Sequence, residues 1–151
     1  MVKVKRLLPG DEELGQRAIN TVKPAQERNH EDVTVDYIHK FLEQEKNVLI
    51  VASEHGHPVG FALAYELDRV DRDRPMMLFY EIAVLKSHQR RGIARAMIGK
   101  LKEVCREQKV MKMWVCTSKS NTAAMHLYES TGGRPGGGDD VMFVYGSDGL
   151  A

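Results

Sequence analysis

Residues 80–94, with the sequence YEIAVLKSHQRRGIA, contain the change of pattern that decides the fold. Residues 76–85 form a nearly continuous apolar run that is typical of a strand, whereas from Gly92 onward apolar residues recur at helical spacing. A strand that leads through a glycine-bearing turn into a helix exposes unpaired backbone N–H groups at the helix start. The stretch therefore predicts a binding site for phosphate.

The side chains of this turn suit a diphosphate. Gly92 lacks a Cβ, so the backbone can approach a ligand closely, and Ala94 keeps the next turn narrow. Arg90, Arg91 and Arg95 add positive charge. The chain has no GxxxxGKS or GxxxxGKT, which disfavours a nucleoside triphosphatase, and no GxGxxG with a downstream acid, which disfavours a dinucleotide fold.

The regions on either side of this stretch predict a mixed sheet. The apolar run at 48–52, a turn containing glycine and proline, and the apolar residues of 59–67 together predict a hairpin. Thr34 can cap a helix whose apolar residues recur at helical spacing. We expect strands at about 2–8, 48–52, 59–67, 76–85, 110–117 and 141–145, and helices starting near Asp11, Thr34, Gly92 and Asn121. This order predicts an α/β fold with helices on both faces of the sheet.

The bulk composition narrows the class of protein. The chain has 151 residues, of which 42% are hydrophobic and 28% charged, and no internal repeat, so we expect a single domain over 1–151. No apolar run approaches the roughly 20 residues that cross a bilayer, and no h-region follows the charged start, which predicts a cytoplasmic protein without a membrane partner. The two cysteines and six histidines lack metal-ligand spacing, so no metal is expected.

Two motifs resemble those of a known family. The pattern QxxGxA at 89–94, after EIAV at 81–84, is similar to the coenzyme A motif of the GCN5-related N-acetyltransferase (GNAT) family. The pattern NxxAxxxY at 121–128 resembles that family's second motif, at the expected separation. The resemblance implies a central twisted, mixed and mostly antiparallel sheet of six to seven strands, flanked by about four helices. It also implies acetyl coenzyme A as the co-substrate.

Within this family, the chain looks most similar to the aminoglycoside 3-N-acetyltransferases of type I. The similarity lies in GFALAY at 60–65, in the tyrosine and acid before IAV, in RRGIA at 90–94 and in the acidic pair before VMF at 141–143. Asn121 and Ser118 depart from the type I pattern, because those enzymes carry acids at both positions. These departures are compatible with acetyl transfer but weaken the case for an aminoglycoside ring system.

The resemblance implies a role for each residue of the two motifs. The backbone of Ile82 and Val84 would contact the pantetheine arm, and Ala83 would lie where the strand splays. Asn121 would hydrogen-bond the same arm. The amides from 89 to 95 would hold the pyrophosphate. The implied coenzyme-binding residues are Ile82, Ala83, Val84, Gln89, Arg90, Arg91, Gly92, Ile93, Ala94, Arg95, Asn121, Ala124 and Tyr128.

Catalysis of acetyl transfer to an amine requires a base, because the amine is protonated at neutral pH. Glu81 is the candidate, either as base or as a carboxylate that only binds the substrate's ammonium group. Tyr128 is the candidate proton donor to the leaving thiolate, with a half-buried packing aromatic as the alternative. Asp139 and Asp140 either line the entry of a polycation or belong to a solvated turn.

Three hypotheses about function follow from these residues. The first is acetyl transfer to a primary amine of a small cationic substrate, with an aminoglycoside, at its 3-amino group, as the leading candidate. The second is transfer to a peptide or protein amine, and the third is an acyl coenzyme A sensor without catalysis. We expect no nucleic-acid partner, and a homodimer in which residues 141–145 contribute a shared edge.

Overall fold

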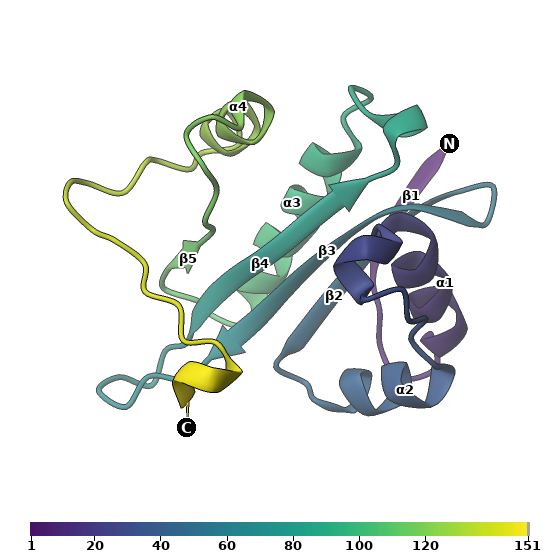
Figure 1. The fold of residues 1–151 in the computed structure, drawn as a ribbon, viewed down its shortest axis with the longest axis horizontal. Coiled ribbons are helices and arrows are strands. Elements are labelled where there is room, and N and C mark those ends of the chain that lie inside the picture. The colour runs from purple at the N-terminus through teal and green to yellow at the C-terminus, as the bar shows by residue number, and fades with distance from the viewer. Residues whose placement is uncertain (151) are drawn as a thin grey trace.

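The computed structural model describes residues 1–150, in which five strands form one sheet in the order β1-β2-β3-β4-β5 (Figure 1). Neighbouring strands from β1 to β4 are antiparallel, and β5 is parallel to β4. The sheet is therefore mixed and mostly antiparallel, as predicted. The strands are β1 (Val2–Arg6), β2 (Asn47–Glu54), β3 (His57–Leu67), β4 (Met76–Val84) and β5 (Met113–Trp114).

Four α-helices accompany the sheet, which confirms the expected number. Helices α1 and α2 cover one face and α3 lies on the opposite face, while α4 stands beyond β5 (Figure 1). The helices are α1 (Glu12–Val22), α2 (Val35–Glu43), α3 (Ile93–Glu107) and α4 (Thr122–Ser130). None of these helices has both the length and the apolar character needed to span a bilayer.

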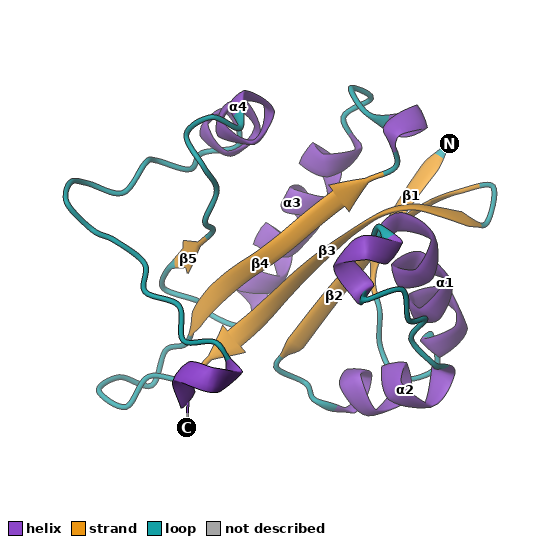
Figure 2. Cartoon of the chain, viewed as in Figure 1, coloured by secondary structure: helices purple, strands orange, loops and turns teal. Residues whose placement is uncertain are grey.

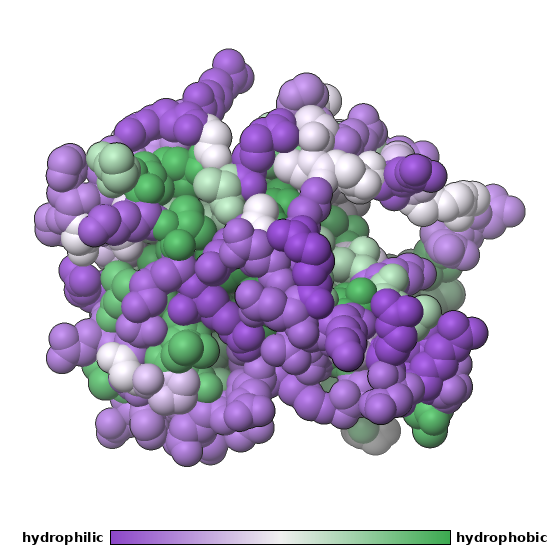
Figure 3. Space-filling view, turned by 180° about the vertical axis from the view of Figure 1, so that it is seen from behind, coloured by the Kyte–Doolittle hydropathy of each residue, from purple (hydrophilic) through white to green (hydrophobic). Residues whose placement is uncertain are grey.

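Strand β2 is buried on both faces, which explains its continuous apolar sequence. Successive side chains of a strand point to opposite faces of the sheet. Val48, Ile50 and Ala52 accordingly pack in the core on the α3 side, whereas Leu49 and Val51 pack in the core under α1 and α2. The outer side of α3 is hydrophilic (Figure 3), as expected for a helix with one apolar stripe.

Local sequence signals account for several boundaries. The Thr34 hydroxyl accepts a hydrogen bond from the Tyr37 N–H at 3.1 Å and so caps α2, as predicted. His55 and Gly56, with φ of 51° and 78°, form the two-residue turn between β2 and β3. Such a left-handed pair matches the twist of the hairpin strands.

The expectation of six to seven strands is wrong, because the sheet has five. The strand expected at 110–117 is reduced to Met113–Trp114, and the strand expected at 141–145 does not form (Figure 2). The five apolar residues at 141–145 are instead 70 to 82% exposed. A strand needs a partner edge as well as apolar side chains, and the two residues of β5 offer few backbone groups for pairing.

Candidate active site

An extra residue interrupts the pairing of β4 with β3. Glu81 lies opposite Leu63 and Phe79 lies opposite Ala64, so Tyr80 has no partner of its own. This arrangement is a β-bulge, in which two residues of one strand face one residue of the other. The sequence contains no signal for it.

The bulge brings two consecutive side chains to the same face of the sheet. Phe79 before it and Ile82 after it both pack toward the α3 side. Tyr80 and Glu81 both line a pocket on the α1 and α2 side. A regular strand would have placed one of these two side chains on the opposite face.

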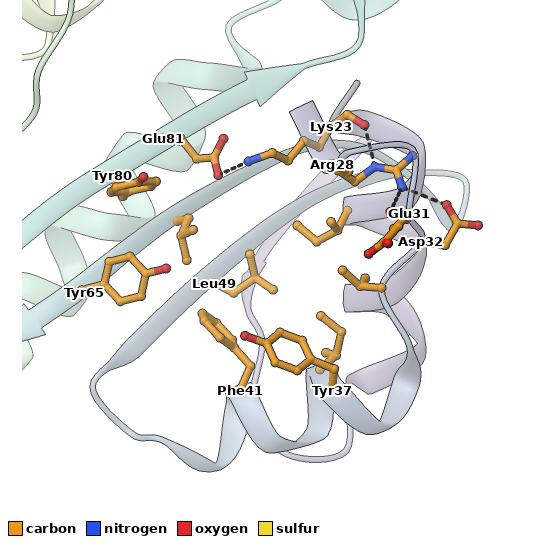
Figure 4. Close-up of a pocket in the computed structure, with 14 residues that line it drawn as sticks. Lys23, Arg28, Glu31, Asp32, Tyr37, Phe41, Leu49, Tyr65, Tyr80 and Glu81 are labelled. Carbon is orange, nitrogen blue, oxygen red and sulfur yellow. Dashed lines mark hydrogen bonds and ion pairs between the residues drawn. The ribbon is translucent and has the colours of Figure 1, made fainter. Parts of the chain in front are cut away.

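This pocket has a volume of about 400 Å³ and lies between the sheet, α1, α2 and the segment that joins the two helices (Figure 4). Its walls carry three acidic residues and two basic residues among apolar and aromatic side chains. The lining residues are Ile19, Lys23, Arg28, Glu31, Asp32, Val33, Tyr37, Ile38, Phe41, Leu49, Leu63, Tyr65, Tyr80 and Glu81. Of these residues, only Glu81 was predicted from the sequence as a site residue.

Glu81 forms an ion pair with Lys23 across the pocket (Figure 4). The distance from Lys23 Nζ to Glu81 Oε1 is 2.7 Å, and the two side chains are 22% and 26% exposed. Lys23 is the residue that follows α1, so this contact joins the end of a helix to the bulge of β4. The two residues are separated by 58 positions in the sequence, which explains why no sequence pattern indicates the pair.

Arg28 holds the connection between α1 and α2 in shape. Its side chain is 10% exposed, and the guanidinium donates hydrogen bonds to four oxygens of the connection and its flanks. The acceptors are the carbonyls of Asn20, Lys23 and Glu31 and the carboxylate of Asp32. A nearly buried guanidinium with this many partners fixes the backbone that carries Lys23.

A pair of hydrogen bonds between Asn20 and Val33 also holds the connection between α1 and α2. The Asn20 side chain accepts from the Val33 N–H at 2.9 Å and donates to the Val33 carbonyl at 3.1 Å. Together with Arg28, this pair of bonds shapes one wall of the pocket from residues that show no recognisable motif.

Three aromatic rings line the opposite side of the pocket in a row. Phe41 meets Tyr65 edge to face at 6.3 Å between centroids, and Tyr65 meets Tyr80 in the same way at 5.8 Å. Burial raises the pKa of the Tyr65 hydroxyl above its ordinary value. The row ends at Tyr80, next to Glu81, so an apolar or ring-shaped ligand body has a surface leading to the carboxylate.

The turn before α3 contains a series of open backbone donors. Within residues 1–150, the six N–H groups from Arg90 to Arg95 have no protein acceptor, and the first N–H of this region that bonds back to the turn is that of Ala96, to Gly92. The Gln89 N–H differs, because it makes a long 3.4 Å contact with the Lys86 carbonyl. The N–H groups from 90 to 95 are therefore open among the described residues, and their binding of a pyrophosphate stays a prediction.

Two residues of this turn are left-handed. Gly92 has a φ of 78° and Arg90 a φ of 62°. The conformation at Gly92 is costly for any residue with a Cβ, although the space around it is open. Left-handed residues in such a turn point successive N–H groups into one concavity that suits an anion.

The arginines of the turn have different partners. Arg91 pairs with Glu54 at 2.6 Å, and His88 contacts the same carboxylate at 2.9 Å. The hydrogen bonds from Arg91 lower the pKa of Glu54 to about 2. Arg95 donates to the carbonyl and hydroxyl of Ser130 and so ties α3 to α4. Arg90 has no such contact among the described residues. The charge that the three arginines would add for a diphosphate stays a prediction.

Strands β4 and β5 pair over two residues only. Met77 lies opposite Met113 and Leu78 opposite Trp114, and within residues 1–150 the rest of β4 pairs with β3 alone. The stretch from Ile82 to Val84, which includes Ala83, therefore has no strand partner on the β5 side among the described residues. The expected splay begins earlier than Ala83, directly after Leu78.

The second motif lies on α4. The Asn121 side chain accepts from the Ala124 N–H at 3.1 Å and caps the helix, so its oxygen serves the fold. Tyr128 is half-buried and meets Phe79 edge to face at 5.8 Å. Burial raises the pKa of Tyr128, so its hydroxyl keeps its proton at neutral pH.

The structure does not bring all predicted site residues together. Tyr128 packs against the core on the α3 side, whereas Glu81 lines the pocket on the other face of the sheet. Asp139 and Asp140 lie exposed in the segment after α4, and neither lines the pocket. Acidic residues of the pocket come instead from Glu31 and Asp32.

Comparison with known proteins gives the same fold. No curated protein sequence matches. An aminoglycoside acetyltransferase from an uncultured soil metagenomic sample, HMB0005, has a TM-score of 0.79 and 28% identity over 95% of this chain and 99% of its own. A second enzyme of that kind, meta-AAC0020, in complex with sisomicin, has a TM-score of 0.83 and 22% identity over 97% and 95%. Aminoglycoside N-acetyltransferase AAC(6')-Iy in complex with CoA has a TM-score of 0.73 and 19% identity over 97% and 95%.

The family itself is given by a sequence model described as the acetyltransferase (GNAT) family, which matches residues 16–132. This range covers most of the chain and includes both the turn at Gly92 and the bulge of β4. The chain belongs to the GNAT family of acetyltransferases.

Proposed function

We propose that the protein transfers the acetyl group of acetyl coenzyme A to a primary amine of a small cationic substrate. One observation carries this proposal. Strand β4 ends in a turn with six open N–H groups, and the same strand carries Glu81 into a pocket of about 400 Å³. A diphosphate held at the turn and an amine held at Glu81 would thus be positioned by one rigid element.

The residues of the turn fit the coenzyme. The open amides from Arg90 to Arg95 and the positive end of α3 would bind the pyrophosphate. The β4 edge without a strand partner, at Ile82 and Val84, would offer backbone groups to the pantetheine arm. When bound, acetyl coenzyme A supplies an activated acetyl group on a thioester.

The protein's own side chains would then transfer the protons of the reaction. The acceptor's ammonium would lose its proton to Glu81, directly or through water, and its nitrogen would form a bond to the carbonyl carbon as the C–S bond breaks. A backbone N–H of Ile82 or a neighbour would stabilise the negative charge on the carbonyl oxygen. From the α3 side of the sheet, Tyr128 would give its proton to the departing thiolate and would recover one, through water, from the nitrogen of the amide that forms. No covalent bond to the protein forms.

An aminoglycoside is the leading acceptor, with the 3-amino group as the site favoured by the sequence resemblance. The likeness to HMB0005, at 28% identity, supports the substrate class. The pocket supports a cation, since Glu31, Asp32 and Glu81 outnumber Lys23 and Arg28. The aromatic row would pack against the apolar faces of sugar rings.

A thiol-release assay over aminoglycosides, polyamines and peptides tests the proposal. We expect turnover of at least one aminoglycoside, and product analysis by NMR should place the acetyl group on the 3-amino nitrogen. Turnover of peptides without turnover of aminoglycosides would contradict the acceptor class. Failure of acetyl coenzyme A to bind in calorimetry would contradict the whole proposal.

The variant Glu81→Gln tests the role of the carboxylate. We expect kcat to fall about 100-fold, because the amide cannot accept the proton, with coenzyme affinity unchanged within about twofold. Glu107→Gln, at the exposed end of α3, is the matched control and should behave as the unmodified protein.

A further inference from the structure

We propose that Lys23 is an internal cation of the acceptor pocket, which competes with the acceptor's ammonium group for the carboxylate of Glu81. The inference rests on the proposed function, because it concerns how the acceptor enters the same pocket. It assigns a role to a residue outside both sequence motifs.

The geometry places the Lys23 ammonium where a substrate ammonium would bind. Its Nζ lies 2.7 Å from Glu81 Oε1, within the range of a charge-assisted hydrogen bond. Figure 4 shows the side chain reaching from the end of α1 to the carboxylate on β4. Both residues line the pocket, so an acceptor that reaches Glu81 must share or replace this contact.

The backbone of Lys23 is fixed, although its side chain is accessible. The Lys23 N–H donates to the Ile19 carbonyl at 3.1 Å, and its carbonyl accepts from Arg28 Nε at 3.1 Å. Pro24, which follows, restricts the chain further. Displacement therefore requires rotation of the lysine side chain only, without movement of α1.

The charges of the pocket make the exchange selective for cations. A neutral ligand cannot replace an ammonium on a carboxylate at little cost, because it would leave Glu81 without a charged partner. An ammonium restores the pair, and the displaced Lys23 side chain, already 22% exposed, can move into water. Lys23 thus weakens the binding of every amine by a similar factor and leaves neutral ligands unaffected.

Direct binding measurements test this role without requiring turnover. The probes are sisomicin, benzylamine with one ammonium group, and benzyl alcohol as its neutral analogue, each titrated by calorimetry or NMR. We expect Lys23→Met to raise the affinity of both amines about fivefold and to leave that of benzyl alcohol unchanged. Lys23→Arg, which keeps the cation, should stay within about twofold of the unmodified protein.

Two further variants distinguish competition for Glu81 from a general effect of removing a positive charge. In a Glu81→Gln background, Lys23→Met should give no gain in amine affinity, because the carboxylate for which Lys23 and the amine compete is absent. Lys100→Met, a lysine on the outer side of α3, should change nothing. Thermal unfolding of each variant establishes that it is folded, and Lys23→Gln replaces Lys23→Met if the latter is not.

Unchanged or weaker amine binding by Lys23→Met, or a gain that persists beside Glu81→Gln, would overturn the inference. Absence of amine binding in every variant up to millimolar concentration would overturn it too. Calorimetry with acetyl coenzyme A in the same proteins reports separately on the proposed function, since the turn at Gly92 lies outside the pocket.

Discussion

The turn at 89–95 and the pocket at Glu81 are built in different ways, although both adjoin β4. The turn is one continuous stretch whose open N–H groups follow from the local backbone alone. The pocket draws its walls from residues between Ile19 and Glu81, and its shape depends on contacts across tens of positions. Anion binding at a helix start can therefore be recognised in a sequence, whereas an acceptor pocket needs the folded chain.

The largest effect is expected on coenzyme affinity, from a substitution in the turn before α3. Gly92→Glu combines an unfavourable left-handed conformation with a negative charge at the diphosphate site. We expect affinity for acetyl coenzyme A, measured by calorimetry, to fall more than about 100-fold. Amine binding at the pocket should remain.

The control is the same substitution seven residues along the same helix. Gly99 is exposed in α3, and a side chain there would meet no atom within 4 Å. Gly99→Glu should bind the coenzyme normally, and equal losses in both variants would show that the turn has no special role.

The pocket should be more sensitive to Arg28 than to any residue of the turn. Arg28→Met removes the hydrogen bonds that hold the α1–α2 connection, at a cost of about 1–3 kcal/mol in the free energy of unfolding. We expect KM for the amine to rise about tenfold while coenzyme affinity stays the same. Arg72→Met, in an exposed loop, is the control, and an effect on the coenzyme instead of the amine would contradict the separation of the two sites.

The expected effect of Tyr128 on the rate is about as large as that of Arg28 on KM. Tyr128→Phe keeps the edge-to-face contact with Phe79, so the unfolding midpoint should not change. If the hydroxyl protonates the thiolate, kcat should fall about tenfold in steady-state assays, with KM values unaltered. Tyr145→Phe, on an exposed tyrosine, should have no effect, and an equally active Tyr128→Phe would leave only the packing role.

The smallest effect concerns the ion pair beside the turn. The pKa of Glu54 is about 2 in the folded protein, below its ordinary value, so its contribution to stability is complete above about pH 4.5 and is lost as the pH falls through 2. Glu54→Gln should lower Tm by about 2 °C at pH 6, and the difference should shrink toward pH 2. A difference that stays constant over this range would exclude the carboxylate as its source.

Much of the fold could be predicted because its signals are local. The stripe on α3, the Thr34 cap and the hairpin of β2 and β3 each depend on neighbouring residues, and all three predictions are confirmed. The prediction of a strand at 141–145 is wrong. An apolar run indicates that a segment can form a strand, but it does not supply the edge of another strand with which to pair. Five strands rather than six or seven are the result.

The candidate site divides in the same way. The sequence identifies Glu81, but Lys23 and Arg28 belong to no pattern, and their contacts become visible only when α1 lies over the sheet. Arg91, which the motif would place at a phosphate, pairs with Glu54, and the sequence of the turn does not indicate this contact. The roles assigned to the individual site residues stay predictions until the variants are measured.

Tyr80, the extra residue in β4, affects how the acceptor pocket can change during evolution. The segments before and after Tyr80 each keep their own alternation against α3, so the side chain at this position is inserted without altering the core. Tyr80 is 60% exposed and borders the carboxylate. Selection can therefore exchange this one ring for another side chain, and so reshape the entrance for a new acceptor, without destabilising the sheet that supports it.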